Sequence, residues 1–368
     1  MRGRLRRTVL ALSTCGCVLV GAASPGAQTS RTLPLVWVLA TGGTIAGRGG
    51  ATGAVSDYKP GVVTAEELVK SVPEVKQFAE IKVEQLSNVP SGDLTLDDLL
   101  NLSKRVNAIF AADPRVAGIV VTHGTSTLEE TAYFLNLTIR DDRPVVVTGA
   151  MRPATATSAG GPLNLLNAVR TASTRVARGK GVLVVLNDEI NGAREATKTS
   201  TYRVETFRAP DLGLLGYVDG DEVVFYRSST RRHTTSTEFD VMSIRELPKV
   251  DIYYSYIQPN TEMINALVKS GAKGIVFAGT GAGSISAAER AVLKALRAST
   301  VGPAPVLVRS SRVGSGRVIG LTGLREEYDA LRLIPGDNLN PQKARILLML
   351  ALTRTSNVDD IKRMFLEY

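Results

Sequence analysis

Three short segments of the chain carry side chains suited to nucleophilic catalysis. Thr41-Gly42-Gly43-Thr44 follows an apolar run, and its two glycines allow a sharp turn and a close approach of the backbone to a ligand. A hydroxyl-rich turn at residues 122–127 precedes a predicted helix, whose free N–H groups favour carboxylates. Lys198 lies in the third segment. A threonine hydroxyl needs a base, and a desolvated lysine can serve, so the three segments suit acyl transfer.

Each segment also has an ordinary structural explanation. Threonines are common at strand ends and helix caps, and His123 by itself fits a hydrogen-bonding role better than a catalytic one. A competing signal is the glycine-rich segment 279–284, with Arg309 and Arg312 at the end of the next predicted strand. It resembles a nucleotide loop, but its third glycine comes one residue too early for G-x-G-x-x-G. We therefore favour the threonine and lysine interpretation.

The composition limits the kind of chemistry. The chain has 368 residues, of which 44% are hydrophobic and 21% are charged. This length suggests two domains with their own cores, and the composition excludes disulfide-stapled miniproteins and disordered chains. With two histidines and two cysteines in total, a metal site of imidazole and thiolate ligands is not expected. The sequence therefore predicts hydrolytic chemistry without a metal or a cofactor.

Residues 1–27 have the pattern of a secretory signal peptide. Four arginines precede an apolar stretch of 16 residues, and small or helix-breaking residues follow. Because a membrane span needs about 20 residues, we expect cleavage between residues 23 and 28, with an uncleaved anchor as the alternative. Cleavage would remove both cysteines and lower the formal net charge from +9 to +5. We expect a periplasmic or secreted protein without stable membrane insertion, and no nucleic-acid partner, because no long basic block remains.

Apolar runs alternate with helical patterns through most of the chain. The runs are nearly continuous, which is typical of parallel strands covered on both faces. The predicted strands lie at 35–40, 116–124, 144–150, 181–187, 250–257, 273–279 and 305–311. Helices are expected around Leu99–Phe110, at Leu128–Thr138 with Ser126 or Thr127 as its cap, and at 162–173, 262–269, 287–298, 340–355 and 358–368. This alternation predicts an α/β fold with parallel strand order.

The alternation breaks near residue 210. A hairpin is predicted at 216–227, around Asp219-Gly220, and a polar, turn-rich stretch follows it. We therefore expect a larger N-terminal α/β catalytic domain at 33–210 and a smaller C-terminal α/β domain at 249–368. Residues 211–248 would form a linker that contains the hairpin.

Two motifs resemble the signatures of the bacterial type II L-asparaginase and glutaminase-asparaginase family. They are ATGGTIAG at 40–47 and VVTHGTSTLEETAYFL at 120–135. Further segments such as VRSSRVGSG and LNPQKARILLMLALT match in order, and the resemblance covers about 33–368. It implies an asparaginase-type amidohydrolase that releases ammonia from the side chain of L-asparagine, with L-glutamine as a further candidate substrate. It also implies a homotetramer whose active sites are completed by a neighbouring subunit.

The resemblance implies two sets of catalytic residues. The first set maps to Thr44 as the nucleophile and to Tyr58 on the loop at 45–63, whose glycines suit a closing lid. The second set maps to Thr125 and Lys198.

Substrate recognition is where this chain departs from the family pattern. Ser91 matches a residue that contacts the α-carboxylate, and Glu326 or Glu327 would be the acid supplied by the facing subunit. However, Ser126 stands where the family has an aspartate for the α-ammonium group, and Gly92 stands where it has glutamine or glutamate. The loss of a buried carboxylate opposite an amine costs a few kcal/mol, which is on the order of a hundredfold in binding.

Three functions remain open from the sequence. The chain could hydrolyse asparagine or glutamine despite Ser126, or act as an amidase of the same fold on a substrate that lacks a free α-ammonium group. It could also be a catalytically weak homologue that binds an amide or amino acid. The presence of all four catalytic residues favours the two enzyme interpretations.

Overall fold

The computed structural model describes residues 32–49, 57–220, 222–299, 304–320 and 323–368. The predicted signal peptide and the middle of the expected lid lie outside these ranges. Within them, no helix is both long enough and apolar enough to cross a membrane.

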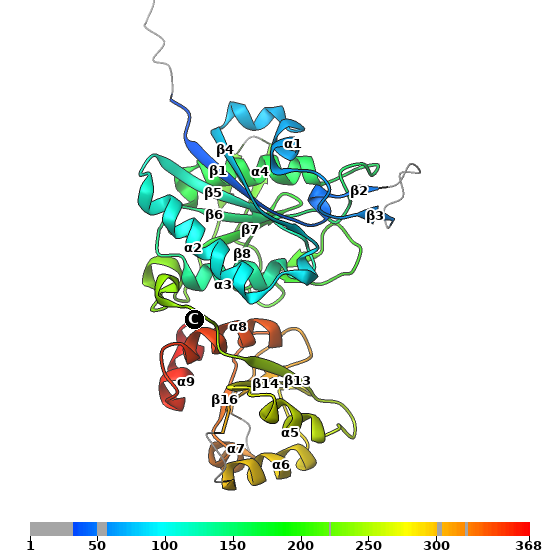
Figure 1. Ribbon diagram of the computed structural model, residues 1–368, viewed down its shortest axis with the longest axis vertical. Helices are drawn as coiled ribbons and strands as arrows, with labels where there is room; N and C mark the ends of the chain where they lie inside the picture. Colours follow the sequence, from blue (N-terminus) through cyan, green and yellow to red (C-terminus); the bar gives the residue numbers. More distant parts are fainter. Residues whose placement is uncertain (1–31, 50–56, 221, 300–303, 321–322) are drawn as a thin grey trace, which may run out of the picture. The chain divides into compact units, whose positions relative to one another are not determined.

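The N-terminal domain is built on an eight-stranded sheet with the order β12-β11-β8-β7-β6-β5-β1-β4 (Figure 1). The neighbouring strands from β4 to β7 run parallel, whereas β8, β11 and β12 pair antiparallel at one side. The strands are β1 Leu35–Gly42, β4 Glu80–Val89, β5 Val116–Thr122, β6 Val145–Thr148, β7 Val182–Leu186, β8 Glu189–Gly192, β11 Gly216–Asp219 and β12 Glu222–Phe225.

Helices cover both faces of this sheet. They are α1 Ala65–Lys70 and α4 Gly161–Ser173 on one face, and α2 Leu96–Ala112 and α3 Leu128–Thr138 on the other. Side chains alternate between the faces of a strand. On β1, Val36 and Val38 pack with α1 and α4, while Leu35 and Leu39 pack with α2 and α3. This two-sided burial explains why the central strands read as continuous apolar runs.

The C-terminal domain has a smaller sheet of four parallel strands in the order β13-β14-β15-β16. Its strands are β13 Val250–Tyr254, β14 Gly274–Gly279, β15 Val306–Ser311 and β16 Leu333–Pro335. Its helices are α5 Glu262–Lys269, α6 Ala287–Ala298, α7 Arg325–Ala330, α8 Pro341–Leu352 and α9 Val358–Glu367. The core between the sheet and α5, α6 and α7 is separate from the core that contains α8 and α9. The predicted α/β fold, with a larger N-terminal and a smaller C-terminal domain, is confirmed.

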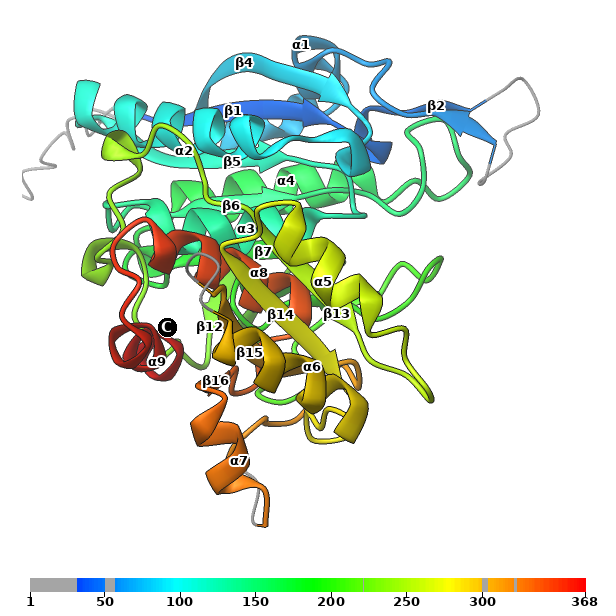
Figure 2. The same ribbon diagram turned by 60° about the horizontal axis from the view of Figure 1, so that its bottom comes forward.

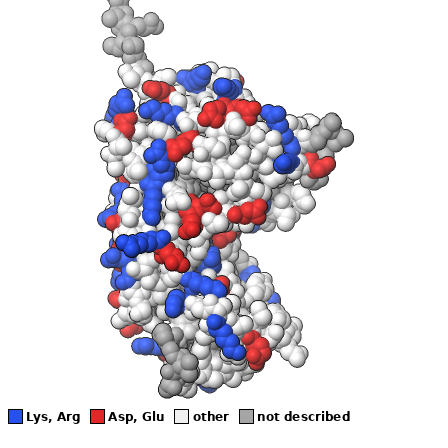
Figure 3. All heavy atoms as spheres, in the orientation of Figure 1, with Lys and Arg blue, Asp and Glu red and all other residues white. Residues whose placement is uncertain are grey.

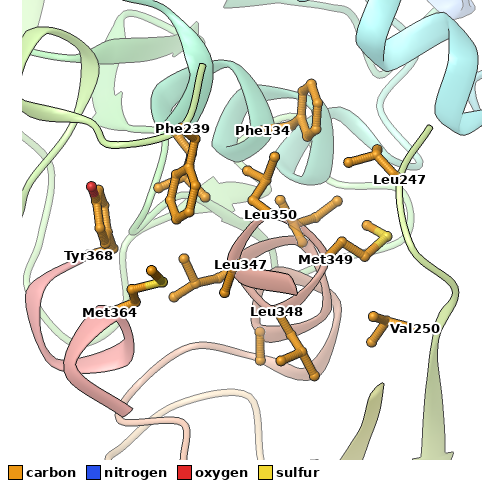
Figure 4. Close-up of a cluster of buried hydrophobic side chains, with 14 of the residues drawn as sticks. Phe134, Phe239, Leu247, Val250, Leu347, Leu348, Met349, Leu350, Met364 and Tyr368 are labelled. Atoms are coloured by element: carbon orange, nitrogen blue, oxygen red, sulfur yellow. The ribbon is translucent and has the colours of Figure 1, made fainter. Parts of the chain in front are cut away.

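One apolar core joins the two domains. Helix α8 lies between α3 and the smaller sheet (Figures 1 and 2). Phe134 from α3 and Phe239 from the connecting segment face Leu347 and Leu350 of α8, with Tyr368 at the C-terminus beside them (Figure 4). Full burial of one large apolar side chain stabilises the folded state by roughly 1.5–3 kcal/mol. The packing of this shared core therefore holds the two domains together.

The structure refines two local predictions. The hairpin at 216–227 forms as β11 and β12, but it pairs with β8 and so extends the large sheet instead of lying in a linker. The exact domain boundaries at 210 and 249 stay a prediction. Helix α3 begins after Thr127, yet neither predicted residue caps it by its side chain. The Thr127 hydroxyl donates to the Ser91 carbonyl oxygen at 2.7 Å instead.

Buried charges between the domains are paired. Asp337 is 4% exposed, and its carboxylate lies 2.7 Å from the Arg231 guanidinium and 2.5 Å from that of Arg317. The buried guanidinium of Arg194 lies 3.8 Å from the same carboxylate.

On the surface, basic and acidic side chains are interspersed on the face shown in Figure 3.

Candidate active site

The end of β1 places Thr44 on a tight turn. The backbone has positive φ at Gly42 (102°) and Gly43 (82°), a conformation that glycine adopts at little cost. Thr44 then begins a 3-10 turn and is buried. Its hydroxyl lies 2.7 Å from the hydroxyl of Tyr58, and Tyr58 stands on the two-residue strand β3 Tyr58–Lys59, which pairs with β2 Arg48–Gly49. The first predicted pair is therefore formed.

The second predicted pair is formed as well. Thr125 lies on the turn between β5 and α3 and is buried. Lys198 stands on β9 Thr197–Lys198, which pairs with β10 Phe207–Arg208, and its Nζ donates to the Thr125 hydroxyl at 2.9 Å. Burial lowers the pKa of the Lys198 ammonium, and the negative charge of Glu129 opposes this shift. A lysine shifted in this direction has a larger neutral fraction near pH 7 and is a better base.

Two glycines bring the threonine turns into backbone contact. A Cβ atom built on Gly43 would lie 2.2 Å from the Cα of Gly124, and one built on Gly124 would lie 2.6 Å from the Ser91 hydroxyl. Because β1 and β5 are adjacent parallel strands, their carboxyl ends meet at one edge of the sheet. The absence of a side chain on Gly43 lets the two threonine turns touch, and its absence on Gly124 makes room for Ser91.

His123 supports the second turn from within. It is fully buried, with Nδ1 2.7 Å from the Gly124 carbonyl oxygen and Nε2 2.9 Å from the Thr131 hydroxyl. Because a carbonyl oxygen only accepts, Nδ1 carries the proton and Nε2 accepts from Thr131. Desolvation lowers the pKa of His123 to about 4, so the ring is neutral at pH 7. These contacts favour the structural role that the sequence suggested for this histidine.

The residues expected to recognise substrate lie at the rim of the site. Ser91 is buried at the start of a 3-10 turn, whereas Gly92 and Ser126 are exposed. A Cβ built on Gly92 would meet nothing within 4 Å. Both departures from the family pattern therefore stand where a larger side chain would have room.

The two candidate acids of the C-terminal domain differ in their surroundings. The Glu327 carboxylate lies 2.8 Å from Arg290 Nε and 2.7 Å from Lys294 Nζ of α6 in the same chain. Glu326 is exposed on α7, and no ion pair holds it among the described residues. Of the two, Glu326 has the carboxylate that no ion pair neutralises among the described residues of this chain.

A polar network behind Lys198 was not predicted from the sequence. The buried Glu129 carboxylate accepts hydrogen bonds from Asn340 Nδ2 at 3.1 Å and from Gln342 Nε2 at 3.2 Å. Lys343 Nζ lies 3.9 Å from the same carboxylate. The network involves the segment Asn-Pro-Gln-Lys at 340–343. Polar residues of this kind are common at the start of a helix, so the sequence did not reveal their contact with Glu129.

The same helix start also holds the segment that leads to Lys198. Lys343 is buried, and its Nζ donates to the carbonyl oxygens of Arg194, at 2.8 Å, and of Ala196. Asn340 Nδ2 lies 3.4 Å from the Thr197 hydroxyl. Burial lowers the pKa of Lys343 to about 8. The first turn of α8 in the C-terminal domain therefore fixes the backbone next to Lys198.

Two family models match the chain over most of its length. The model described as "Asparaginase, N-terminal" matches residues 35–231, and that described as "Glutaminase/Asparaginase C-terminal domain" matches residues 249–365. The chain belongs to the asparaginase family.

Individual asparaginases resemble this chain along nearly their whole length. It is 48% identical to L-asparaginase 2 of Bacillus subtilis over 346 residues, which cover 94% of this chain and 89% of that protein. It is 43% identical to the probable periplasmic L-asparaginase of Haemophilus influenzae, with 99% and 100% covered. The crystal structure of a probable cytoplasmic L-asparaginase from Campylobacter jejuni superposes with a TM-score of 0.85 at 44% identity, covering 91% of this chain and all of that one.

The contact between the threonine turns of this asparaginase can be tested by Gly43→Ala. The added Cβ would overlap the Gly124 backbone at 2.2 Å, at a position whose φ is 82°. We expect the free energy of unfolding to fall by roughly 2 kcal/mol, as in other overpacked sites, in urea titrations followed by circular dichroism. Gly160→Ala is the matched control, since its Cβ would have its nearest neighbour at 3.7 Å. Equal stability of the two variants would contradict the proposed constraint.

Proposed function

We propose that this protein hydrolyses the side-chain amide of L-asparagine to L-aspartate and ammonia, with L-glutamine as a further candidate substrate. The observation that carries this proposal is the pairing of Thr44 with Tyr58 and of Thr125 with Lys198 on turns in backbone contact. The family membership and the names of the relatives support the same reaction.

In the proposed mechanism, Thr44 is the nucleophile. Its Oγ1 attacks the amide carbon of the substrate while its proton leaves through the Tyr58 hydroxyl, which lies 2.7 Å away. The tetrahedral intermediate breaks its carbon–nitrogen bond, and the departing nitrogen takes up a proton and leaves as ammonia. Water then attacks the acyl-threonine ester, which releases aspartate and restores the Thr44 hydroxyl. The role of Tyr58 depends on exclusion of water when the loop closes.

The second pair moves protons in this proposal. Lys198 Nζ is 2.9 Å from the Thr125 hydroxyl, and burial lowers its pKa. In its neutral form, Lys198 can take the proton of Thr125 while Thr125 receives the proton that leaves Thr44 through Tyr58. Lys198 then returns its proton to Thr125 as Thr125 protonates the departing nitrogen, so that both groups end as they began. This role agrees with general acid–base catalysis by a lysine whose pKa is brought toward neutrality.

The same geometry bears on the two alternative functions. A binding protein would need neither hydroxyl to be paired with a base, and the relatives are named for asparagine and glutamine hydrolysis, so neither alternative is favoured. Ser91 is proposed to contact the α-carboxylate of the substrate. Ser126 and Gly92 provide no charge for the α-ammonium group, which points to weaker selection of that group.

We also propose a homotetramer in the periplasm or outside the cell. The composition of residues 1–27 supports export, as does the periplasmic designation of the Haemophilus influenzae relative. The exposed carboxylate of Glu326 is the proposed contribution of the facing subunit to the Thr44 pair.

Replacement of the proposed nucleophile tests the reaction directly. We expect Thr44→Ala to lower kcat for ammonia release from L-asparagine by at least roughly a thousandfold, as loss of a catalytic nucleophile does in other hydrolases. Thr44→Ser is the matched control, because it keeps the hydroxyl and should retain measurable turnover. Full turnover by Thr44→Ala would refute the assignment of Thr44. Absence of ammonia release by the wild type, with asparagine still raising its melting temperature, would favour the binding alternative.

Restoring the missing carboxylate tests the recognition of the α-ammonium group. We expect Ser126→Asp to raise kcat/KM for L-asparagine by on the order of tenfold to a hundredfold, because it pairs the substrate amine with a charge. Ser126→Asn, which has the same shape without the charge, should give little gain, and Nα-acetyl-asparagine should show no gain with either variant. If Ser126→Asp leaves kcat/KM for asparagine unchanged, another group of this protein recognises the amine.

The charge of Glu129 should set the pH dependence of catalysis through Lys198. The carboxylate raises the pKa of Lys198 against the effect of burial, so Glu129→Gln lowers that pKa and increases the neutral fraction of Lys198 at a given pH. We therefore expect the acidic limb of the kcat/KM profile to move to lower pH. Glu130→Gln is the control, since Glu130 is not among the charges that shift the pKa of Lys198. An unchanged limb, or one that moves to higher pH, would contradict the role of Lys198 as the base.

A further inference from the structure

A cavity in the C-terminal domain lies outside the site described above. Its volume is about 230 Å³, and its walls come from β15, β16, α7, α9 and the segment before α7. The lining residues are Arg309, Gly320, Arg325, Tyr328, Asp329, Leu333, Pro335 and Lys362. This volume is below the roughly 300–1,000 Å³ of sites for drug-sized ligands, so the cavity suits a small ion or molecule and is too small for a dinucleotide.

Arg309 on β15 is the unusual residue of this cavity. It is 1% exposed, and its guanidinium stacks on the Tyr328 ring at 4.3 Å. Two of its nitrogens donate to backbone carbonyl oxygens, those of Gly283 at 3.1 Å and Ile319 at 2.9 Å. Its Nε is buried without a hydrogen-bond partner in the described chain. A guanidinium has five N–H donors, so part of its hydrogen-bonding capacity is unused.

The charge of Arg309 also lacks a counter-ion. No carboxylate lies within ion-pair distance of it among the described residues, and burial lowers its pKa with only the Tyr328 hydroxyl opposing this shift. Arg194, which is buried to a similar degree, has the carboxylate of Asp337 beside it. A buried charge without a counter-ion is costly, so the contrast between the two arginines favours an anion beside Arg309 in addition to its carbonyl and ring contacts.

The other charged residues of the cavity favour the same sign of ligand. Arg325 and Lys362 are exposed at its rim, and Asp329 supplies its one acidic side chain. Three cationic groups against one carboxylate leave the lining with an excess of positive charge. The guanidinium group of arginine pairs well with two oxygens of a planar carboxylate or of a tetrahedral phosphate.

We propose that this cavity is a binding site for a small oxyanion, in which Arg309 is the buried anchor and Arg325 and Lys362 are the cations of the rim. The proposal is independent of the function proposed above, because none of these residues belongs to the threonine pairs. In this proposal Arg309, which the sequence offered as part of a nucleotide loop, binds a small anion instead. That arginine binds the backbone at Gly283, within the glycine-rich segment 279–284, and the cavity beside it accepts an anion of limited size.

The test compares the melting temperature of the full-length protein in sodium phosphate and in sodium chloride at equal ionic strength. We expect phosphate to raise the melting temperature of the wild type by a few degrees, because a ligand that binds only the folded state stabilises it. The double variant Arg325→Gln/Lys362→Gln should lose at least half of this shift. Lys70→Gln/Lys269→Gln is the matched control, since it removes two exposed cations from α1 and α5, and it should keep the full shift.

Succinate in place of phosphate identifies the oxyanion. A shift with succinate that the rim variant loses assigns a carboxylate ligand, and a shift with phosphate alone assigns a tetrahedral one; both results support the site. A full phosphate shift in the rim variant would place the anion elsewhere and overturn the proposal. The absence of any wild-type shift with both anions would overturn it as well. Titration calorimetry of the rim variant, which leaves Arg309 intact, should show at least tenfold weaker binding of the same anion.

Discussion

The close approach of Gly43 to Gly124 is the constraint on which the site depends. Adjacent parallel strands bring their carboxyl ends together, but a side chain at Gly43 would hold the two turns apart. A Cβ on Gly43 would lie 2.2 Å from the neighbouring backbone. Because each glycine immediately precedes one of the two proposed catalytic threonines in the sequence, the contact between the glycines sets the relation of Thr44 to Thr125. The placement of the two threonines therefore rests on a residue that has no side chain, Gly43.

The second pair depends on the C-terminal domain as well as on the large sheet. Lys198 stands on a two-residue strand, which by itself offers little support. The first turn of α8 supports this strand, because Lys343 donates hydrogen bonds to carbonyl oxygens just before Lys198. In the same turn, Asn340 donates to the Glu129 carboxylate. Apolar packing of α8 against α3 keeps that turn in place. Movement between the domains would thus change both the position of the Lys198 amine and the charge beside it.

Sequence patterns predicted the parts of the fold that are buried on both faces. The runs that became β1, β5, β6 and β7 were found because their side chains are apolar without interruption. Strand β4 was missed because it is an edge strand whose side chains are mostly half-exposed, so its residues are mixed in polarity. The hairpin β11–β12 was found but was assigned to a linker, since four-residue strands do not reveal which sheet they join. Tertiary pairing with β8 decides this.

The same distinction applies to the site. Thr44, Tyr58, Thr125 and Lys198 were predicted through motifs, and the structure brings each pair within hydrogen-bond distance. Glu129 was not predicted, because a glutamate in the first turn of a helix has an ordinary role there. Its importance arises from residues more than 200 positions away. Ser126 and Gly92 present the opposite case, since they differ from the family pattern at exposed positions. An exposed ion pair at the rim contributes at most about 1 kcal/mol, whereas a covered one contributes more. The strength of a charge placed at position 126 therefore depends on how far water is excluded around that residue.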